Sequence, residues 1–210
     1  LLTAVKIYIQ ANDGEFNQVQ YDQLVSQYGE PIGSWCTSQL TNFSSIFSIE
    51  AHSDYVDEIK AFNEDISGWD TSLATDMSFM FLGAESFNQN INNWNTGLVT
   101  NFESMLASAR AFNQPIGSWN TINAQSFQEM FRGASMFNQN LNAWSTPNLL
   151  KLAGMFNDAQ AFNGDISSFL VNKVEDFSSL FLGAISFNSN IGNWNMENAL
   201  NLQRMFMEAI

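Results

Sequence analysis

Hydrophobic and polar positions along this chain repeat with a period of 25 residues. Large aliphatic residues recur at 66, 91, 116, 141, 166 and 191, and Phe-Asn pairs recur from 62–63 to 187–188. Aromatic residues hold a third position at the same interval: Trp69, Trp94, Trp119, Trp144, Phe169 and Trp194. A constant period between 20 and 50 residues indicates a solenoid, in which each unit buries its apolar side by stacking on its neighbours.

Within one unit, residues 91–115, the spacing changes from that of a strand to that of a helix. Trp94 and Thr96 are two residues apart, so they are expected on the same side of a short strand. Thr100 and Glu103 have the spacing of a capping box. Apolar residues then follow at helical spacing, and the equivalent segments of other copies end in glycine, at Gly83, Gly133 and Gly183.

These patterns predict an α/β repeat solenoid. Each unit is expected to contain a strand, a turn, a short helix and a second turn. The spacing of isoleucine, tryptophan, threonine and valine in residues 91–99 has the form of a leucine-rich repeat. The predicted fold is therefore a leucine-rich-repeat-like right-handed coil of short parallel strands and short helices, with about seven repeats and an N-terminal helical cap.

The pattern also predicts how the chain is divided. Residues 1–31 lack the repeat but have helical spacing, so they are expected to cap the solenoid of residues 32–210; an upstream domain fragment is the alternative. The interval from Trp35 to Trp69 is 34 residues, which places a nine-residue insertion near 49–57. The last unit stops before its Phe-Asn pair, so we expect a solenoid truncated at its C-terminus.

The asparagine of each Phe-Asn pair is expected to form a ladder along the stack. Every turn of a coil has backbone groups that need a partner, and a side-chain amide can supply it. The alternative is a row of amides that contact glycans. The members of this ladder are Asn63, Asn88, Asn113, Asn138, Asn163 and Asn188.

The repeat resembles a known family. The unit Met-Phe-x-Gly-Ala-x-x-Phe-Asn-Gln, found at 130–139, together with Ile-x-x-Trp-Asn-Thr and Val-Thr-Asn-Phe, resembles the BspA-like leucine-rich-repeat surface proteins over residues 32–210. This resemblance implies a cell-surface or secreted repeat protein without an assigned biochemical activity, some of whose relatives are implicated in adhesion. Phe169 in place of tryptophan and the insertion depart from the pattern.

Side chains for catalysis are sparse. His52 is the only histidine and Cys36 the only cysteine, and no phosphate loop, zinc motif or calcium loop is present, so no catalytic residue, metal or cofactor is expected. A lone histidine in a loop is expected to be solvated, and the carboxylates around it to form a solvated acidic surface. The insertion is nevertheless a candidate site, because insertions in repeat arrays gather on one face. Its candidate residues are Glu50, His52, Asp54, Tyr55 and Asp57.

A second candidate site is the exposed side of the predicted strands. Alternation with the buried tryptophan column places one residue of each unit outward: Asp70, Asn95, Asn120, Ser145, Leu170 and Asn195. Such an array could bind an extended partner, or its small residues could simply fit a crowded sheet. The threonine column beside the tryptophans would suggest an ice- or crystal-binding face if it pointed outward, but we expect it to point inward.

Charge narrows the functional classes. The chain has 7 basic and 21 acidic residues, a formal net charge of −14, which argues against nucleic-acid binding and against docking on an anionic membrane. No apolar run is long enough to insert into a bilayer. We therefore expect a non-enzymatic extracellular or cell-surface protein that binds a protein partner or an extracellular polymer, or forms a segment of a larger assembly. An ice-, mineral- or glycan-binding protein is the alternative, a carboxylate-based hydrolase or lyase a weaker one, and self-association through the C-terminal end a further expectation.

Overall fold

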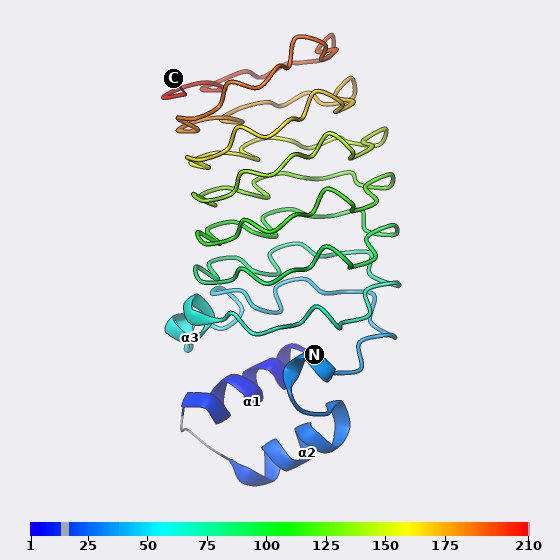
Figure 1. The fold of residues 1–210 in the computed structure, drawn as a ribbon, viewed down its shortest axis with the longest axis vertical. Coiled ribbons are helices and arrows are strands. Elements are labelled where there is room, and N and C mark those ends of the chain that lie inside the picture. Colours follow the sequence, from blue (N-terminus) through cyan, green and yellow to red (C-terminus); the bar gives the residue numbers. More distant parts are fainter. Residues whose placement is uncertain (14–16, 210) are drawn as a thin grey trace.

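The computed structural model describes residues 1–13 and 17–209 as one stack of coils with helices at one end (Figure 1). The elements in chain order are α1 (Leu2–Asp13), α2 (Gln18–Tyr28), the 3-10 helix η1 (Ile32–Ser34) and α3 (Val56–Ala61). From residue 62 onward, each 25-residue unit makes one coil, and successive coils lie on one another like the steps of a ladder.

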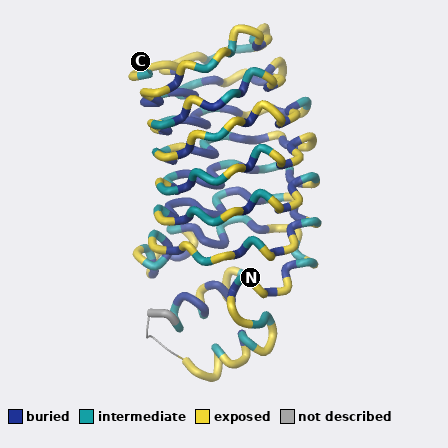
Figure 2. Tube along the Cα trace, viewed as in Figure 1, coloured by how far each residue is buried: buried dark blue, intermediate teal, exposed yellow. Residues whose placement is uncertain are grey.

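Apolar side chains fill the interior of every coil. Along each coil, buried and exposed positions alternate in the tube of Figure 2. The aliphatic column is fully buried from Ile66 to Ile166, and the tryptophan column is nearly so. Rings stack between coils, for example Trp119 on Trp144 with centroids 6.2 Å apart and Phe137 on Phe162 at 5.9 Å. Aromatic rings thus provide a continuous core for a thin structure.

The predicted short helices are absent from the described coils. The segment 77–84 has helical apolar spacing, but residues at two positions of each unit, such as Phe79 and Gly83, have positive φ angles of 57° and 77°. A left-handed residue every fourth position breaks a right-handed helix into consecutive tight turns. Local bonds such as Met80 N to Met77 O (3.3 Å) close these turns. Apolar residues three and four apart therefore face inward without a helix.

The same segment stacks on its neighbour through its backbone. Alternate N–H groups, beginning at Met77 and ending at Gly83, donate to carbonyl groups 24 residues later at 2.8–3.0 Å. Isolated parallel bridges join the corners of successive coils, as between Asp76 and Asn101. The inter-coil backbone hydrogen bonds are thus concentrated where the sequence predicted helices.

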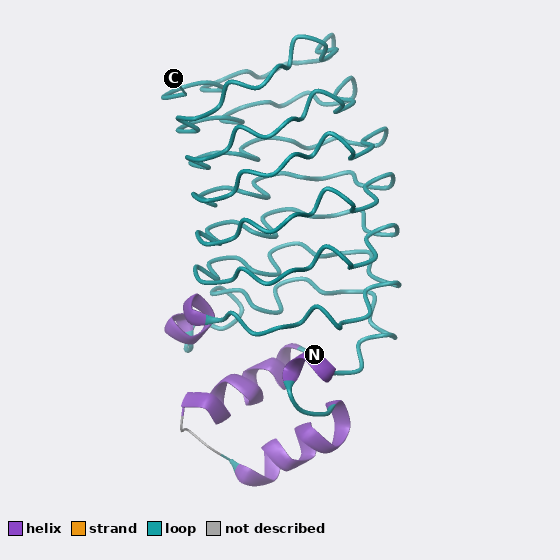
Figure 3. Ribbon diagram, viewed as in Figure 1, coloured by secondary structure: helices purple, strands orange, loops and turns teal. Residues whose placement is uncertain are grey.

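The predicted strands are also absent from the described residues, and Figure 3 draws the coils from residue 62 onward entirely as loop. In residues 91–99, Trp94 N donates to Ile91 O (3.2 Å) and Val99 N donates to Thr96 O (3.0 Å). These two turns consume N–H groups that a parallel ladder would need. The prediction of an α/β leucine-rich-repeat solenoid with parallel strands is therefore wrong, because tight turns replace both regular elements.

Helices α1 and α2 lie against the first coil. Tyr8 of α1 meets Trp35 edge-on with centroids 5.8 Å apart, and Tyr28 at the end of α2 lies 5.2 Å from the same ring. Asn17 caps α2 by accepting a hydrogen bond from Gln20 N, and Gly29 ends it with a φ of 91°. The two helices cover apolar surface of the first coil; the boundary between cap and solenoid at residue 31 stays a prediction.

Candidate functional site

The predicted outward column, which we call the polar face, is exposed at all six positions. Its members are Asp70, Asn95, Asn120, Ser145, Leu170 and Asn195. Four of them form local turns, in which the side-chain oxygen accepts a hydrogen bond from the N–H two residues later, as from Ser72 N to Asp70 at 2.9 Å. Hydrogen bonds from the Ser72 side chain and N–H hold the pKa of Asp70 below its usual value. The polar face thus combines a structural role with an exposed, repeating surface.

Exposed apolar side chains lie on the coil segments next to the polar face. Leu73, Leu98 and Ile122 are 41–48% exposed, and Leu150 is 49% exposed. Leu170, the fifth member of the polar face, adds an apolar side chain to the face itself. The surface is therefore mixed in polarity, as surfaces that bind proteins commonly are.

The threonine column points inward, as predicted. Thr71, Thr96, Thr121 and Thr146 are at most 2% exposed. Each hydroxyl donates to a backbone carbonyl 24 residues later, as from Thr96 Oγ1 to Asn120 O at 3.1 Å. These hydroxyls tie neighbouring coils together and are not presented to an ice or crystal surface.

The asparagine ladder is confirmed. Asn113 Oδ1 accepts from Asn138 N and from Gln139 Nε2, both at 2.9 Å. Equivalent N–H to Oδ1 bonds of 2.8–3.0 Å run from Asn63 up to Asn188. Because the amide oxygens are occupied by the next coil, the structural interpretation of the column accounts for these contacts without a glycan.

The insertion is folded onto the coil. Glu50, Asp54 and Asp57 are exposed, whereas His52 and Tyr55 are only 4% and 8% exposed. The expectation of a solvated His52 is therefore wrong. Its Nε2 lies 2.8 Å from Ile46 O, so the tight turn at 49–52 places the ring against the coil, and no hydrogen-bond partner reaches Nδ1 among the described residues. Burial lowers the pKa of His52, with Lys6 adding to the effect and the Ile46 hydrogen bond opposing it.

Helix α1 contacts the insertion with two side chains. Gln10 Nε2 donates to Tyr55 Oη at 2.7 Å, and Lys6 Nζ lies 3.8 Å from the Asp54 carboxylate and 5.7 Å from the centre of the Tyr55 ring. The five candidate residues of the insertion therefore fall into two groups. Two of its residues are structural, and its three carboxylates remain at the surface.

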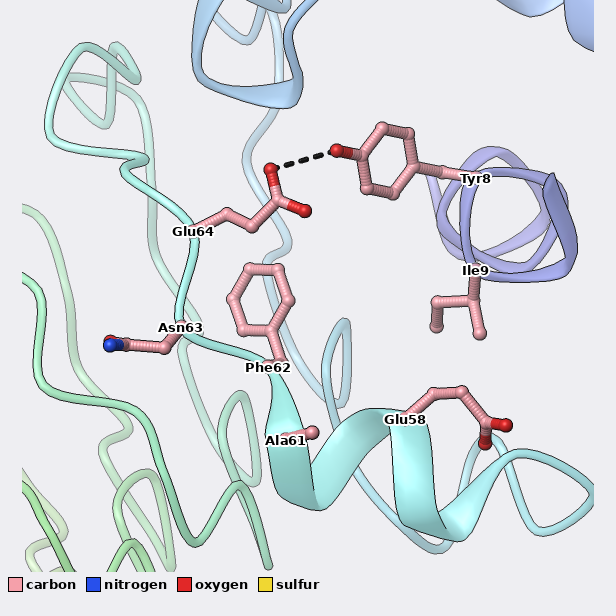
Figure 4. Close-up of a pocket in the computed structure, with 7 residues that line it drawn as sticks. All are labelled: Tyr8, Ile9, Glu58, Ala61, Phe62, Asn63 and Glu64. Atoms are coloured by element: carbon pink, nitrogen blue, oxygen red, sulfur yellow. Dashed lines mark hydrogen bonds between the residues drawn. The ribbon is translucent and has the colours of Figure 1, made fainter. Parts of the chain in front are cut away.

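A pocket of about 230 Å³ lies where α1, α3 and the coil meet (Figure 4). Tyr8 and Ile9 of α1 face Phe62 across it, and Glu64 accepts a hydrogen bond from the Tyr8 hydroxyl at 2.8 Å. The remaining lining residues are Glu58, Ala61 and Asn63. Sequence reasoning missed this pocket, because its walls come from segments about fifty residues apart; the pair of acidic residues at 64–65 was the only visible signal.

Residues 1–13 and 17–209 were compared with the side-chain arrangements of metal sites and catalytic sites. There, no group of three or more histidine, cysteine, aspartate or glutamate side chains could hold a metal ion. Cys36 is exposed and free, and it is remote in sequence from His52. Of the helices in this described part, none is long and apolar enough to cross a bilayer.

Comparison with known proteins gives one family. The family model described as "Mycoplasma protein of unknown function, DUF285" matches residues 50–169 and 125–210, which together cover most of the chain. No curated protein and no solved structure matches.

Proposed function

Because the chain belongs to the DUF285 family of Mycoplasma proteins of unknown function, and its repeats resemble those of BspA-like surface proteins, we propose that it is a non-enzymatic interaction protein of the cell surface or the extracellular space. In this role it binds a protein partner or an extracellular polymer, or joins a larger assembly. The observation that supports this best is the polar face, which offers a similar exposed position on six successive coils.

The polar face and its apolar neighbours suit an interaction role better than turnover of a small substrate. Repetition at a constant spacing lets many weak contacts add together along an extended partner. The net charge of −14 and the embedded threonine hydroxyls both favour a protein partner over a nucleic acid or an ice surface.

Localisation is tested on intact cells that make the protein. Antibodies against residues 32–210 should label unpermeabilised cells or the medium, and external protease should remove the label from the cells. Labelling only after lysis would refute the surface assignment.

The binding surface is tested with a matched pair of variants. Leu98→Asp places a charge beside the polar face, and Met136→Asp places one at an exposed position in a different part of its coil; the native side chains are 48% and 58% exposed, so both variants should fold. Beads coated with the Leu98→Asp variant should adhere to a surface that carries the protein or polymer partner roughly tenfold less well than beads coated with the wild-type chain. Beads coated with the Met136→Asp variant should adhere as well as wild-type beads. Equal losses in both variants would count against the polar face.

A further inference from the structure

The pocket between α1 and α3 has an apolar interior with charge on two sides. Ile9, Ala61 and the Phe62 ring supply apolar surface, and the Tyr8 ring forms part of one wall. Glu64 lies beside the Tyr8 hydroxyl that donates to it, and Glu58 projects from α3 on the opposite side of the hollow, pointing away from Glu64. A ligand that fits must combine an apolar stem with a positive head.

No basic side chain lines this pocket in the described part of the chain. The two nearest lysines in sequence are engaged elsewhere: Lys6 lies 3.8 Å from Asp54, and Lys60 lies 3.9 Å from Glu85. Among the described residues, no lysine or arginine thus lines the pocket beside Glu64. An incoming ammonium group would be attracted by the Glu64 carboxylate and would also meet the aromatic rings of the pocket wall.

The surroundings indicate a peptide segment as the source of that group. Between residues 50 and 76 the chain has eight acidic residues and one lysine, which gives −7, half of the formal net charge of −14. Asp54, Asp57 and Asp65 are exposed next to the residues that form the pocket. Such a rim would attract a basic segment and orient it before one side chain enters.

We propose that this pocket binds a lysine side chain of a partner protein, with the alkyl stem against Ile9 and Phe62 and the ammonium group beside the Glu64 carboxylate. This inference rests on the proposed interaction function and names a docking point for it. The exposed acidic residues of the insertion then contact further basic residues of the same segment.

A neutral-flanked peptide with one lysine, acetyl-Ser-Gly-Lys-Gly-Ser-amide, tests the pocket directly by NMR titration of the 210-residue chain. Signals of α1, α3 and residues 62–64 should shift. The same peptide with acetylated lysine, or with norleucine in its place, should bind roughly tenfold more weakly, because the charge is lost while the stem remains. Equal binding of the acetylated peptide, or shifts that avoid these segments, would overturn the proposal.

Three variants separate the pocket from general acidity. Glu64→Gln removes the charge but keeps a hydrogen-bond acceptor for the Tyr8 hydroxyl, and it should weaken binding several-fold. Glu58→Gln removes a charge on the opposite side of the pocket and should weaken binding less. Ala61→Leu keeps all charges and a helix-forming residue but fills the pocket, and it should also weaken binding. Glu197→Gln, exposed on the last coil, is the control and should bind normally.

The pattern of results distinguishes this inference from the proposed function. If the Glu197→Gln control lost binding to the same extent, or if Ala61→Leu retained it, lysine binding in the pocket would be refuted. Non-specific attraction between the acidic chain and the peptide would then explain the binding. Surface labelling and polar-face adhesion do not involve the pocket. Their success together with failure of the lysine titration would therefore overturn only the pocket assignment.

Discussion

At the residue scale, each coil is held by a few side chains with fixed tasks. The Trp119 indole packs against Trp144 and Phe102 and donates from Nε1 to Ile91 O at 3.1 Å. Thr96 and Asn113 make one inter-coil hydrogen bond each to the backbone of the next coil. A tryptophan, a threonine and an asparagine of this kind thus each join one coil to its neighbour.

Truncation of a tryptophan tests this stacking. Trp119→Ala should lower the free energy of unfolding by about 3–5 kcal/mol, because it leaves a cavity between two coils. Trp194 packs against Phe169 of the preceding coil and lies in the last described coil, so Trp194→Ala should cost less. Urea denaturation of both variants measures the difference, and equal midpoints with equal slopes would contradict a core continuous through the stack.

The left-handed positions provide a second residue-scale prediction. Successive units have Gly83, Ser108, Gly133, Asp158 and Gly183 at one such position. Gly133→Ala should destabilise the chain by about 1–2 kcal/mol, since alanine is strained at a φ of 69°.

Ser108→Gly is the reverse change at the equivalent residue, where φ is 58°. It should be neutral or stabilising, because glycine relieves the same strain while it makes the unfolded chain more flexible. Thermal unfolding measures both variants. A stabilising Gly133→Ala would show that these turns do not have left-handed residues in solution.

At the element scale, the insertion and the N-terminal helices form one interface. Lys6, Gln10 and Tyr8 of α1 contact Asp54, Tyr55 and Glu64, respectively. His52 lies behind this interface with its ring buried against the coil. The packing of α1 therefore depends on the fold of a segment about fifty residues later in the sequence.

His52 makes the stability of this interface depend on pH. Because burial lowers its pKa in the folded chain from an ordinary value of 6.5, the unfolded chain binds a proton more readily. Its contribution to stability is therefore complete above pH 6.5 and is lost as the pH falls through the folded pKa. After correction for the intrinsic exchange rates, the hydrogen-exchange protection of residues 46–62 should therefore decrease as the pH is lowered from 7 to 5.

His52→Gln is the matched variant for this prediction. The glutamine amide can donate to Ile46 O but does not titrate in this range. After correction for intrinsic rates, protection of residues 46–62 should change less with pH in the variant than in the wild-type chain. An identical pH response in the two proteins would assign the effect to carboxylates instead.

At the scale of the whole molecule, the two ends of the stack differ. Helices α1 and α2 cover the first coil, whereas the last described coil exposes Leu200, Leu202, Phe206 and Met207 by 48–80%. A net charge of −14 opposes contact between copies of the chain at low salt. Apolar attraction and charge repulsion thus compete at this end.

Salt should shift that balance. The 210-residue chain should self-associate as added salt shortens the range of repulsion, with the Debye length falling to about 3 Å at 1 M. Static light scattering across a sodium chloride series measures the mean mass.

Phe206→Asp at the exposed end should suppress this association, and Leu98→Asp on the side of the stack should not. A wild-type chain that stayed monomeric throughout the series would contradict the C-terminal interface.

The sequence by itself determined the period of the stack and the side of the coil on which each column lies. Apolar columns such as Ile91 and Trp94 are buried, Asn95 is exposed and Thr96 points inward, because burial depends on hydrophobicity at a fixed spacing. The asparagine ladder followed from the same logic, since each turn needs a partner for its backbone. The helical spacing predicted within residues 1–31 likewise agrees with the presence of α1 and α2 there.

Only the tertiary structure decided the backbone conformation and the pocket. Apolar residues three and four apart suit both a helix and a series of tight turns, and the choice depends on N–H groups such as that of Phe79 finding Glu103 O one coil away. The burial of His52 and the meeting of Tyr8 with Glu64 likewise depend on segments distant in sequence. Local pattern contains no information on such contacts, because it reports which side chains avoid water and not which backbone groups are available to pair.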